Sequence, residues 1–414
     1  MTCSSLHAAE LSLTLAESQR LALQRSRLPA SHDFAADAAR HMAIAAAQLP
    51  DPVLKAGIDN LPVSGADRFS PGDDFMTMRR IGIAQELTSQ HKRSLRAAVF
   101  EREAELSGAA RNAAAREIAR DAALAWIDAY HAGRMATLAA EQVTQARNES
   151  EAAGSAYRAG RASQADLFTA RSALAMAEDR ASESGRRLRN AQSMLARWTG
   201  IAAGPEMTLA EPPPTDSIRL DPAALSSQLE HHPQVALLAR QEDIARAETR
   251  LAEANTESDW SVELAFQQRG RAWSNMVSVG ISVPLQWDRP RRQDREVAAK
   301  LALAGQAQAR REEALRAHEA ETRGLIAEWE NNRERHARFV RELLPLAHER
   351  IAAALAAYRG GKATLNELLA ARRNELDVRL QALQLEMDIA RLWAQLDFLA
   401  PDEHAATILN KEAK

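Results

Sequence analysis

The sequence is poor in cysteine and in aromatic residues. Cys3 is the single cysteine, so no disulfide can form within the chain. Aromatic residues make up 4% of the chain although 46% is hydrophobic, so much of the apolar content is alanine and leucine. This composition is typical of contacts between helices. The formal net charge of -3 shows no basic surplus, which argues against nucleic acid as a partner.

Two further absences concern membranes and export. No run of eighteen apolar residues occurs, which excludes a conventional transmembrane helix and leaves membrane-spanning strands open. The first residues, MTCSSLHAAELSL, show neither the charged region nor the apolar stretch of a secretory signal. Either the protein stays in the cytoplasm or its export signal is not present in this sequence. Cys3 is a candidate lipid anchor, although no hydrophobic lipobox precedes it; the alternative is an incidental residue.

Proline is missing from a long stretch. None occurs between Pro71 and Pro205, and the gap is rich in alanine, arginine, glutamate and leucine, which are strong helix formers. This pattern predicts one nearly unbroken helix from about Ser89 to Ala156, roughly 100 Å long at the standard rise per residue. Seven-residue and eleven-residue apolar repeats both occur in it. Such a mixture favours a nearly straight rod that packs laterally against other helices.

One polar phrase is written twice. It reads AYRAGRASQADL from Ala156 and AYRGGKATLNEL from Ala357. A helix is expected after the first phrase, from about Gln164 to Trp198, so the phrase forms the tip of a helical hairpin. The second copy repeats this plan with helices at about 292–357 and 365–399. Pro345 interrupts the first of these, where the first copy has Thr144, and predicts a kink.

The helix starts correspond as well. Thr14-Leu15-Ala16-Glu17 has the pattern of a capping box, and Asp221-Pro222 has the pattern of a cap followed by proline. Each is expected to open a short helix, and a second helix should follow Pro29 and Pro233 respectively. The sequence therefore predicts an internal duplication with a period near 200 residues.

Each half also contains two candidate strands. Trp260, Val262, Leu264 and Phe266 alternate with small or polar residues, which is the period of a β-strand. The strands are expected at about 52–63, 75–88, 260–268 and 275–286, each with one apolar face. Four strands are too few to close a membrane barrel, so closure requires other copies: two chains would give eight strands and three would give twelve. The alternative is a soluble four-stranded sheet with one buried face.

The predicted organisation is therefore two repeats around a connector. The first repeat covers 1–203, with a hairpin at 89–199 and its tip near 157–163. A proline-rich connector covers 204–221. The second repeat covers 222–400, with a hairpin at 291–399 and its tip near 358–364, and a polar tail covers 401–414.

Taken together, these features resemble the outer-membrane efflux proteins typified by TolC. The resemblance rests on the two tip phrases, Tyr157-Arg158-Ala159-Gly160 and Tyr358-Arg359-Gly360-Gly361, and on the two proline-led helix starts. The stretches LPDPVLKAGIDNLPV and FMTMRRIGIAQEL are further similar to the branch that serves heavy-metal pumps of the cobalt-zinc-cadmium and copper-silver type.

The resemblance implies a mainly α fold with a small β part and a homotrimer. Three chains would form a 12-stranded β-barrel in the outer membrane, continued by a long α-helical barrel in the periplasm. The tips would dock a periplasmic adaptor protein and, through it, an inner-membrane RND transporter. The implied function is a passive exit duct for heavy-metal cations, with drugs or other small organic molecules as an alternative substrate class.

The resemblance also implies site residues, for which the sequence leaves plainer alternatives. Gly160 and Gly361 would let the chain turn sharply. Glu367 and Asp166 would form acidic rings that constrict the pore, although Ala370 stands where relatives often have a second acid. The alternatives are residues that cap a helical turn and carboxylates at a solvated helix start. The tip residues implied for docking are Tyr157, Arg158, Gly160, Arg161, Tyr358, Arg359, Gly361 and Lys362.

No catalytic motif, cofactor site or metal pair is recognisable. The sequence has no glycine-rich phosphate loop, nucleophile elbow or His-x-x-x-His pair, and the prediction is a protein that is not an enzyme. His231-His232 is interpreted as a solvated helix entrance. The alternative to a duct is a soluble oligomeric coiled-coil scaffold with a small sheet.

Overall fold

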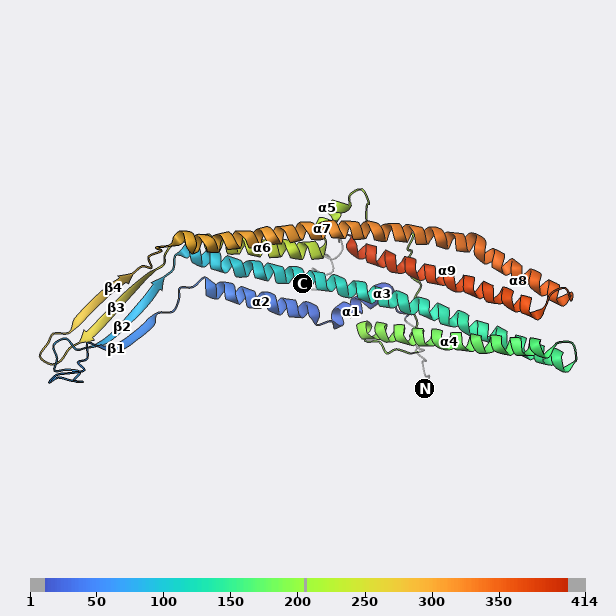
Figure 1. The fold of residues 1–414 in the computed structure, drawn as a ribbon, viewed down its shortest axis with the longest axis horizontal. Helices are drawn as coiled ribbons and strands as arrows, with labels where there is room; N and C mark the ends of the chain where they lie inside the picture. Colours follow the sequence, from blue (N-terminus) through green and yellow to red (C-terminus); the bar gives the residue numbers. More distant parts are fainter. Residues whose placement is uncertain (1–11, 205–206, 401–414) are drawn as a thin grey trace, which may run out of the picture. The chain divides into compact units, whose positions relative to one another are not determined.

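The computed structural model describes residues 12–204 and 207–400, and its elements follow the same order in both halves (Figure 1). Cys3 and the tail 401–414 lie outside the described residues. The first half contains α1 (Leu15–Arg25), α2 (Leu28–Ala46), β1 (Val53–Asp59), β2 (Met78–Leu87), α3 (Gln90–Arg158) and α4 (Gln164–Thr199). The second contains α5 (Leu225–Glu230), α6 (Pro233–Ala254), β3 (Trp260–Gln268), β4 (Met276–Ser282), α7 (Gln293–Arg338), α8 (Leu344–Arg359) and α9 (Leu365–Leu399).

The chain forms two compact units, and each takes segments from both halves. Unit 1 is built from Met1–Pro29, Ala113–His232 and Leu315–Lys414, and unit 2 from Ala30–Asn112 and Pro233–Ala314. Helix α3 has 69 residues and runs without interruption, as the absence of proline predicts. Within the described residues, no helix has both the length and the apolar character needed to cross a membrane.

Unit 2 contains a four-stranded antiparallel sheet in the order β1-β2-β3-β4. Strand β2 pairs with β3 from Arg79↔Gln268 to Leu87↔Trp260, so the central pair of strands joins the two halves of the sequence. Gly82 lies opposite Ala265 in this pairing, and the two backbones approach closely there. The sheet is therefore one body made by both repeats.

The core of unit 1 is assembled around Trp126 of α3. The indole is fully buried and its Nε1 donates a hydrogen bond of 2.8 Å to the carbonyl of Leu13. Leu13 also pairs with Leu209 of the connector. Leu195 of α4 and Ala394 of α9 lie in the same cluster, so the connector, α3, α4 and α9 share one core. This core holds the two helical hairpins together.

The second long helix is interrupted just before Pro345. A π-helical turn, Phe339–Leu343, separates α7 from α8, and Pro345 stands at the start of α8. Proline has no N–H to donate and its ring clashes with the carbonyl four residues earlier, so the regular hydrogen-bond ladder cannot continue. Thr144, at the equivalent level of α3, lies in unbroken helix and donates to the carbonyl of Ala140.

Several predicted element ends need correction. Three strands are shorter than expected: β1 stops at Asp59 where Asn60 adopts a positive φ of 56°, β2 begins at Met78, and β4 stops at Ser282 before Pro284. Strand β3 occupies 260–268 as predicted. Asp221-Pro222 does not start α5, which begins at Leu225; Asp221 Oδ1 instead accepts from the Ala223 N–H in a preceding turn.

Candidate functional site

The two hairpin tips have the same backbone geometry. Gly160 has a φ of +70° and Gly361 a φ of +68°, which is the left-handed region that favours glycine. In the first tip Arg161 N–H donates to the Ala156 carbonyl at 2.9 Å, and in the second Lys362 N–H donates to the Ala357 carbonyl at 2.8 Å. These bonds close the helix end in the manner of a Schellman motif. The repeated phrase therefore specifies one turn, made twice.

The polar side chains of both tips face solvent. Tyr157 is 42% exposed and Tyr358 is 37% exposed. Arg158 donates to Ser155 Oγ at 3.1 Å, one turn earlier on the same helix. The four basic side chains of the tips are all exposed: Arg158, Arg161, Arg359 and Lys362. Each tip therefore presents one half-exposed ring beside two positive charges.

Each returning helix starts with a capping box. Ser163 Oγ accepts from the Asp166 N–H at 3.1 Å, and the Asp166 carboxylate accepts from the Ser163 N–H at 3.0 Å. Thr364 and Glu367 make the same reciprocal pair at 3.3 and 2.8 Å. Hydrogen bonds from the Ser163 hydroxyl and N–H hold the pKa of Asp166 below its usual value. Both predicted pore carboxylates therefore also stabilise a helix start.

The two hairpins pack against each other directly behind the tips. Ala153 and Ala170 from the first hairpin form a buried cluster with Leu365 and Leu369 of α9. Small residues on one side and leucines on the other allow the helices to approach closely. The structure therefore brings the bases of the two tips together within unit 1.

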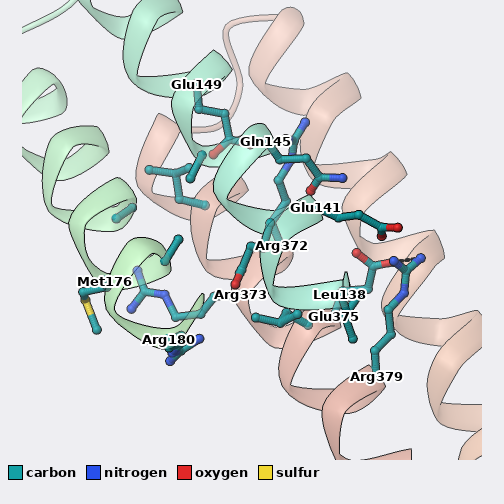
Figure 2. Close-up of a pocket in the computed structure, with 16 residues that line it drawn as sticks. Leu138, Glu141, Gln145, Glu149, Met176, Arg180, Arg372, Arg373, Glu375 and Arg379 are labelled. Carbon is teal, nitrogen blue, oxygen red and sulfur yellow. Dashed lines mark hydrogen bonds and ion pairs between the residues drawn. The ribbon is translucent and has the colours of Figure 1, made fainter. Parts of the chain in front are cut away.

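A small charged cavity lies beyond this cluster, between α3, α4 and α9 (Figure 2). Its volume is about 60 Å³, which is room for a few water molecules. Arg372 forms an ion pair with Glu149, and Arg379 lies 2.7 Å from Glu375. Burial raises the pKa of Glu149, and the charge of Arg372 opposes that rise.

Ion pairs join α3 to α9 along much of their length. Arg391 donates to both oxygens of Asp128 at 2.6 and 2.7 Å, and Arg134 lies 2.5 Å from Glu386. With the Arg372–Glu149 pair, these contacts follow one antiparallel register. They link the two hairpins at three levels within the described residues.

The sheet of unit 2 has one apolar face and one charged face. The apolar residues form an exposed face, on which Leu54 and Val279 are each 71% exposed. The opposite face carries Lys55 Nζ, 2.6 Å from Glu263, while Arg80 lies 3.3 Å from Asp59. The exposed apolar face contains Leu54, Ile58, Ile81, Ile83, Trp260, Leu264, Phe266, Val277, Val279 and Ile281. A face of this size left open to water is rare in a soluble monomer.

The histidine pair departs from the prediction of a solvated helix entrance. His231 is exposed, but His232 is half-buried, with its ring centroid 5.0 Å from that of His318. Burial and the neighbouring positive groups lower the pKa of His232 to about 4. Residues 12–204 and 207–400 contain no cluster of three or more His, Cys, Asp or Glu side chains suited to a metal ion.

Sequence reasoning missed some residues that had a readable signal. The caps Ser163 and Thr364 stand three residues before an acid, which is the capping-box spacing. The ion pairs between α3 and α9 left no such signal, because their partners lie 223 to 263 residues apart.

Among known proteins, solved structures resemble this chain, and the resemblance concerns its fold. No family model matches the chain, and no curated protein does. Among solved structures, CusC, studied for the changes that accompany folding and transmembrane channel formation, has a TM-score of 0.77 at 14% identity over 95% of this chain and 93% of that one. The Campylobacter jejuni CmeC outer membrane channel has a TM-score of 0.74 at 11% identity over 97% and 89%. The Neisseria gonorrhoeae MtrE outer membrane channel, in its open state, has a TM-score of 0.73 at 17% identity over 96% and 93%.

These likenesses define the class of fold. This chain has the fold of outer membrane channels: long helical hairpins joined to a small antiparallel sheet. The mainly α fold expected from the sequence is confirmed.

Proposed function

We propose that the protein is the outer-membrane exit duct of a tripartite efflux pump. The observation that carries the proposal is the sheet, whose exposed face is apolar and whose other face carries Lys55, Arg80 and Glu263. An open four-stranded sheet of this kind cannot stand alone in lipid, because its edge strands β1 and β4 would leave backbone groups unpaired. Three copies would pair these edges into a 12-stranded barrel with the charged face inside.

The helical hairpins supply the rest of the duct in this proposal. Strand β2 leads into α3, a helix of 69 residues whose C-terminal end is the first tip. A trimer would present six tips of two kinds, each with a half-exposed tyrosine and two positive charges. These tips would dock a ring of periplasmic adaptor proteins, which connect the duct to an inner-membrane RND transporter. The named outer membrane channels of the same fold support this role.

Transport through such a duct is passive and needs no catalytic group or cofactor. Asp166 and Glu367, three copies of each, would form acidic constrictions near the tips and favour cations. Heavy-metal cations are the proposed cargo, and drugs or other small organic molecules are the alternative. Growth of a deletion strain on metal salts and on drugs would distinguish the two: sensitivity to metals alone supports the first cargo, and sensitivity to drugs alone contradicts it.

The proposal is tested by placing one charge on either face of the same strand. Val279→Arg puts a charge on the exposed apolar face, and Ser278→Arg is the matched control on the opposite face. An arginine near the middle of the lipid-facing band costs about 2–4 kcal/mol, whereas a lumen position tolerates it. With an export signal attached, the wild type and Ser278→Arg should fractionate with outer membranes as a trimer that needs detergent, and Val279→Arg should not.

The competing candidate is a soluble coiled-coil scaffold. It would remain in the soluble fraction without detergent, and Val279→Arg would improve its solubility. Recovery of the wild type as a soluble oligomer would therefore contradict the duct and support the scaffold.

A further inference from the structure

Two neighbouring arginines of β2 have opposite surroundings. Arg80 lies on the charged face of the sheet, 3.3 Å from Asp59 and 3.5 Å from Glu263. Arg79 therefore points to the other face, because successive side chains of a strand alternate. There it stands in register with Ile58 on β1 and Gln268 on β3.

Arg79 is a charge at the margin of the exposed apolar face. Its next neighbours on that face of β2 are Ile81 and Ile83, which are both exposed. Arg79 is itself exposed, and it has no ion pair or side-chain hydrogen bond with any residue in 12–204 or 207–400. Gln85 is the next polar residue on this face, so the apolar stretch between it and Arg79 measures about 20 Å at 3.3–3.4 Å per residue.

The margin at Arg79 is the end of the sheet where both hairpin loops lie (Figure 1). Aromatic side chains gather in these loops: Phe75 and Trp273 have ring centroids 6.2 Å apart, and Arg269 lies over the Trp273 ring. Arg269 also donates to the Phe75 carbonyl, so it is already engaged within the loops. Aromatic residues at the end of an apolar band are typical of the boundary between hydrocarbon and head groups.

We propose that Arg79 binds a phosphate group of the phosphorylated glycolipid in the outer leaflet. This inference rests on the proposed function, which places the sheet in the outer membrane with its loops outside. A guanidinium at the edge of an apolar surface lays its aliphatic part on that surface and extends its charge to the head groups. Arginine suits phosphate because its planar donors bind two oxygens at once, and a poorly hydrated setting strengthens the contact.

The binding experiment uses the detergent-purified trimer and native mass spectrometry. The probes are bis-phosphorylated lipid A and its fully dephosphorylated form, with inorganic phosphate as a third. Wild type should bind the phosphorylated lipid at least tenfold more tightly than the dephosphorylated one, and inorganic phosphate at the same concentration should not displace it. Arg79→Gln should bind the phosphorylated lipid about tenfold more weakly and the dephosphorylated lipid as tightly as wild type. Arg79→Lys keeps the charge, so its affinity for the phosphorylated lipid should stay within threefold of wild type.

Arg80→Gln is the matched control, because it removes the same charge from the opposite face of the same strand. It should leave lipid A binding unchanged. Equal binding of both lipids by the wild type, wild-type binding by Arg79→Gln, or an equal loss in Arg80→Gln would each overturn the proposal. Fractionation of the same variants separates this failure from a failure of the exit duct: a trimer that inserts into outer membranes with no phosphate preference refutes only the role of Arg79.

Discussion

Gly160 and Gly361 stand at the same position of two hairpin tips and share a positive φ, +70° and +68°. No atom outside the immediate chain neighbours lies within 4 Å of where a Cβ would stand at either residue. The requirement for glycine is therefore a property of the backbone alone. Gly360, next to Gly361, has a φ of -80° and corresponds to Ala159 of the first tip, so the turn does not require glycine at position 360.

Replacing both glycines with valine should disrupt the tips without dissociating the proposed trimer. A non-glycine residue in the left-handed region costs about 1–3 kcal/mol, and a β-branched residue is especially unsuited to it. The tips lie in solvent, so the loss should stay local. We expect resistance that depends on efflux to be lost while native mass spectrometry still finds a trimer.

Gly360→Ala is the control for this pair, because its backbone angles suit any residue. It should keep resistance and change the free energy of unfolding by less than about 1 kcal/mol. Full resistance in the valine variants would contradict docking at the tips.

Glu367→Gln separates the charge of the proposed constriction from the cap of α9. Glutamine at this position preserves the capping box with Thr364, so stability should change by less than about 0.5 kcal/mol. The negative charge is lost, so single-channel recordings should show reduced preference for cations over anions. Thr364→Ala is the converse variant: it should cost about 1 kcal/mol of stability through the lost cap and leave the selectivity as it is. Unchanged selectivity in Glu367→Gln would remove its role in the pore.

The helices and tips could be predicted from caps, glycines and proline positions, which are local features of the sequence. Contacts between residues far apart in the sequence could not be predicted. Helix α9 occupies 365–399 as expected, because Thr364 begins it and no proline interrupts it. The hydrophobic residues before Met78 predict a start of β2 that is too early. In the structure Asp74 Oδ1 accepts hydrogen bonds from the Met76 and Thr77 N–H groups, which keeps this segment in a loop.

The burial of charged groups escaped prediction for the same reason. Lys92 is almost completely buried, and its Nζ donates a hydrogen bond of 2.9 Å to Asp259, which lies 167 residues later. The local sequence around His232 predicts a solvent-exposed side chain, yet its ring lies next to that of His318 on α7. Only the fold brings these partners together, whereas capping and turn signals lie within a few residues of each other.

His232 should make the stability of unit 1 depend on pH. Its pKa is about 4 in the folded chain, below the ordinary value of about 6.5, because of burial and the charges of His318, Arg116 and Arg120. Between these values the unfolded chain binds a proton that the folded chain does not. Stability should therefore fall as the pH is lowered from about 6.5 to about 4, and this contribution should change no further below that. The melting temperature of the purified protein across this range measures the effect.

His232→Gln should reduce that slope, because glutamine does not titrate. His231→Gln is the matched control: this side chain is exposed, so its loss should leave the pH dependence as in the wild type. The same slope in the wild type and in His232→Gln would exclude His232 as its source.

Gly82→Ala should weaken the joint between the two halves of the sheet. A Cβ at Gly82 would lie 2.8 Å from the Ala265 Cβ and 2.9 Å from the Leu264 carbonyl oxygen, so β2 and β3 would have to separate. Such overpacking costs about 1–3 kcal/mol. The fraction of the protein that assembles into the proposed trimer should fall. Gly57→Ala is the control on the same face of the sheet, where no atom lies within 4 Å of the new Cβ, and it should assemble normally.

Adding Ala265→Gly to Gly82→Ala tests the cause of that loss. The second change removes the Cβ contact and leaves the contact with the Leu264 carbonyl, so it should restore trimer only in part. Full assembly of Gly82→Ala alone would mean that the strands separate at no cost. Failure of the double variant to recover any trimer would place the whole penalty on the backbone contact. Partial recovery is the outcome that the two distances require, because each accounts for a separate part of the strain.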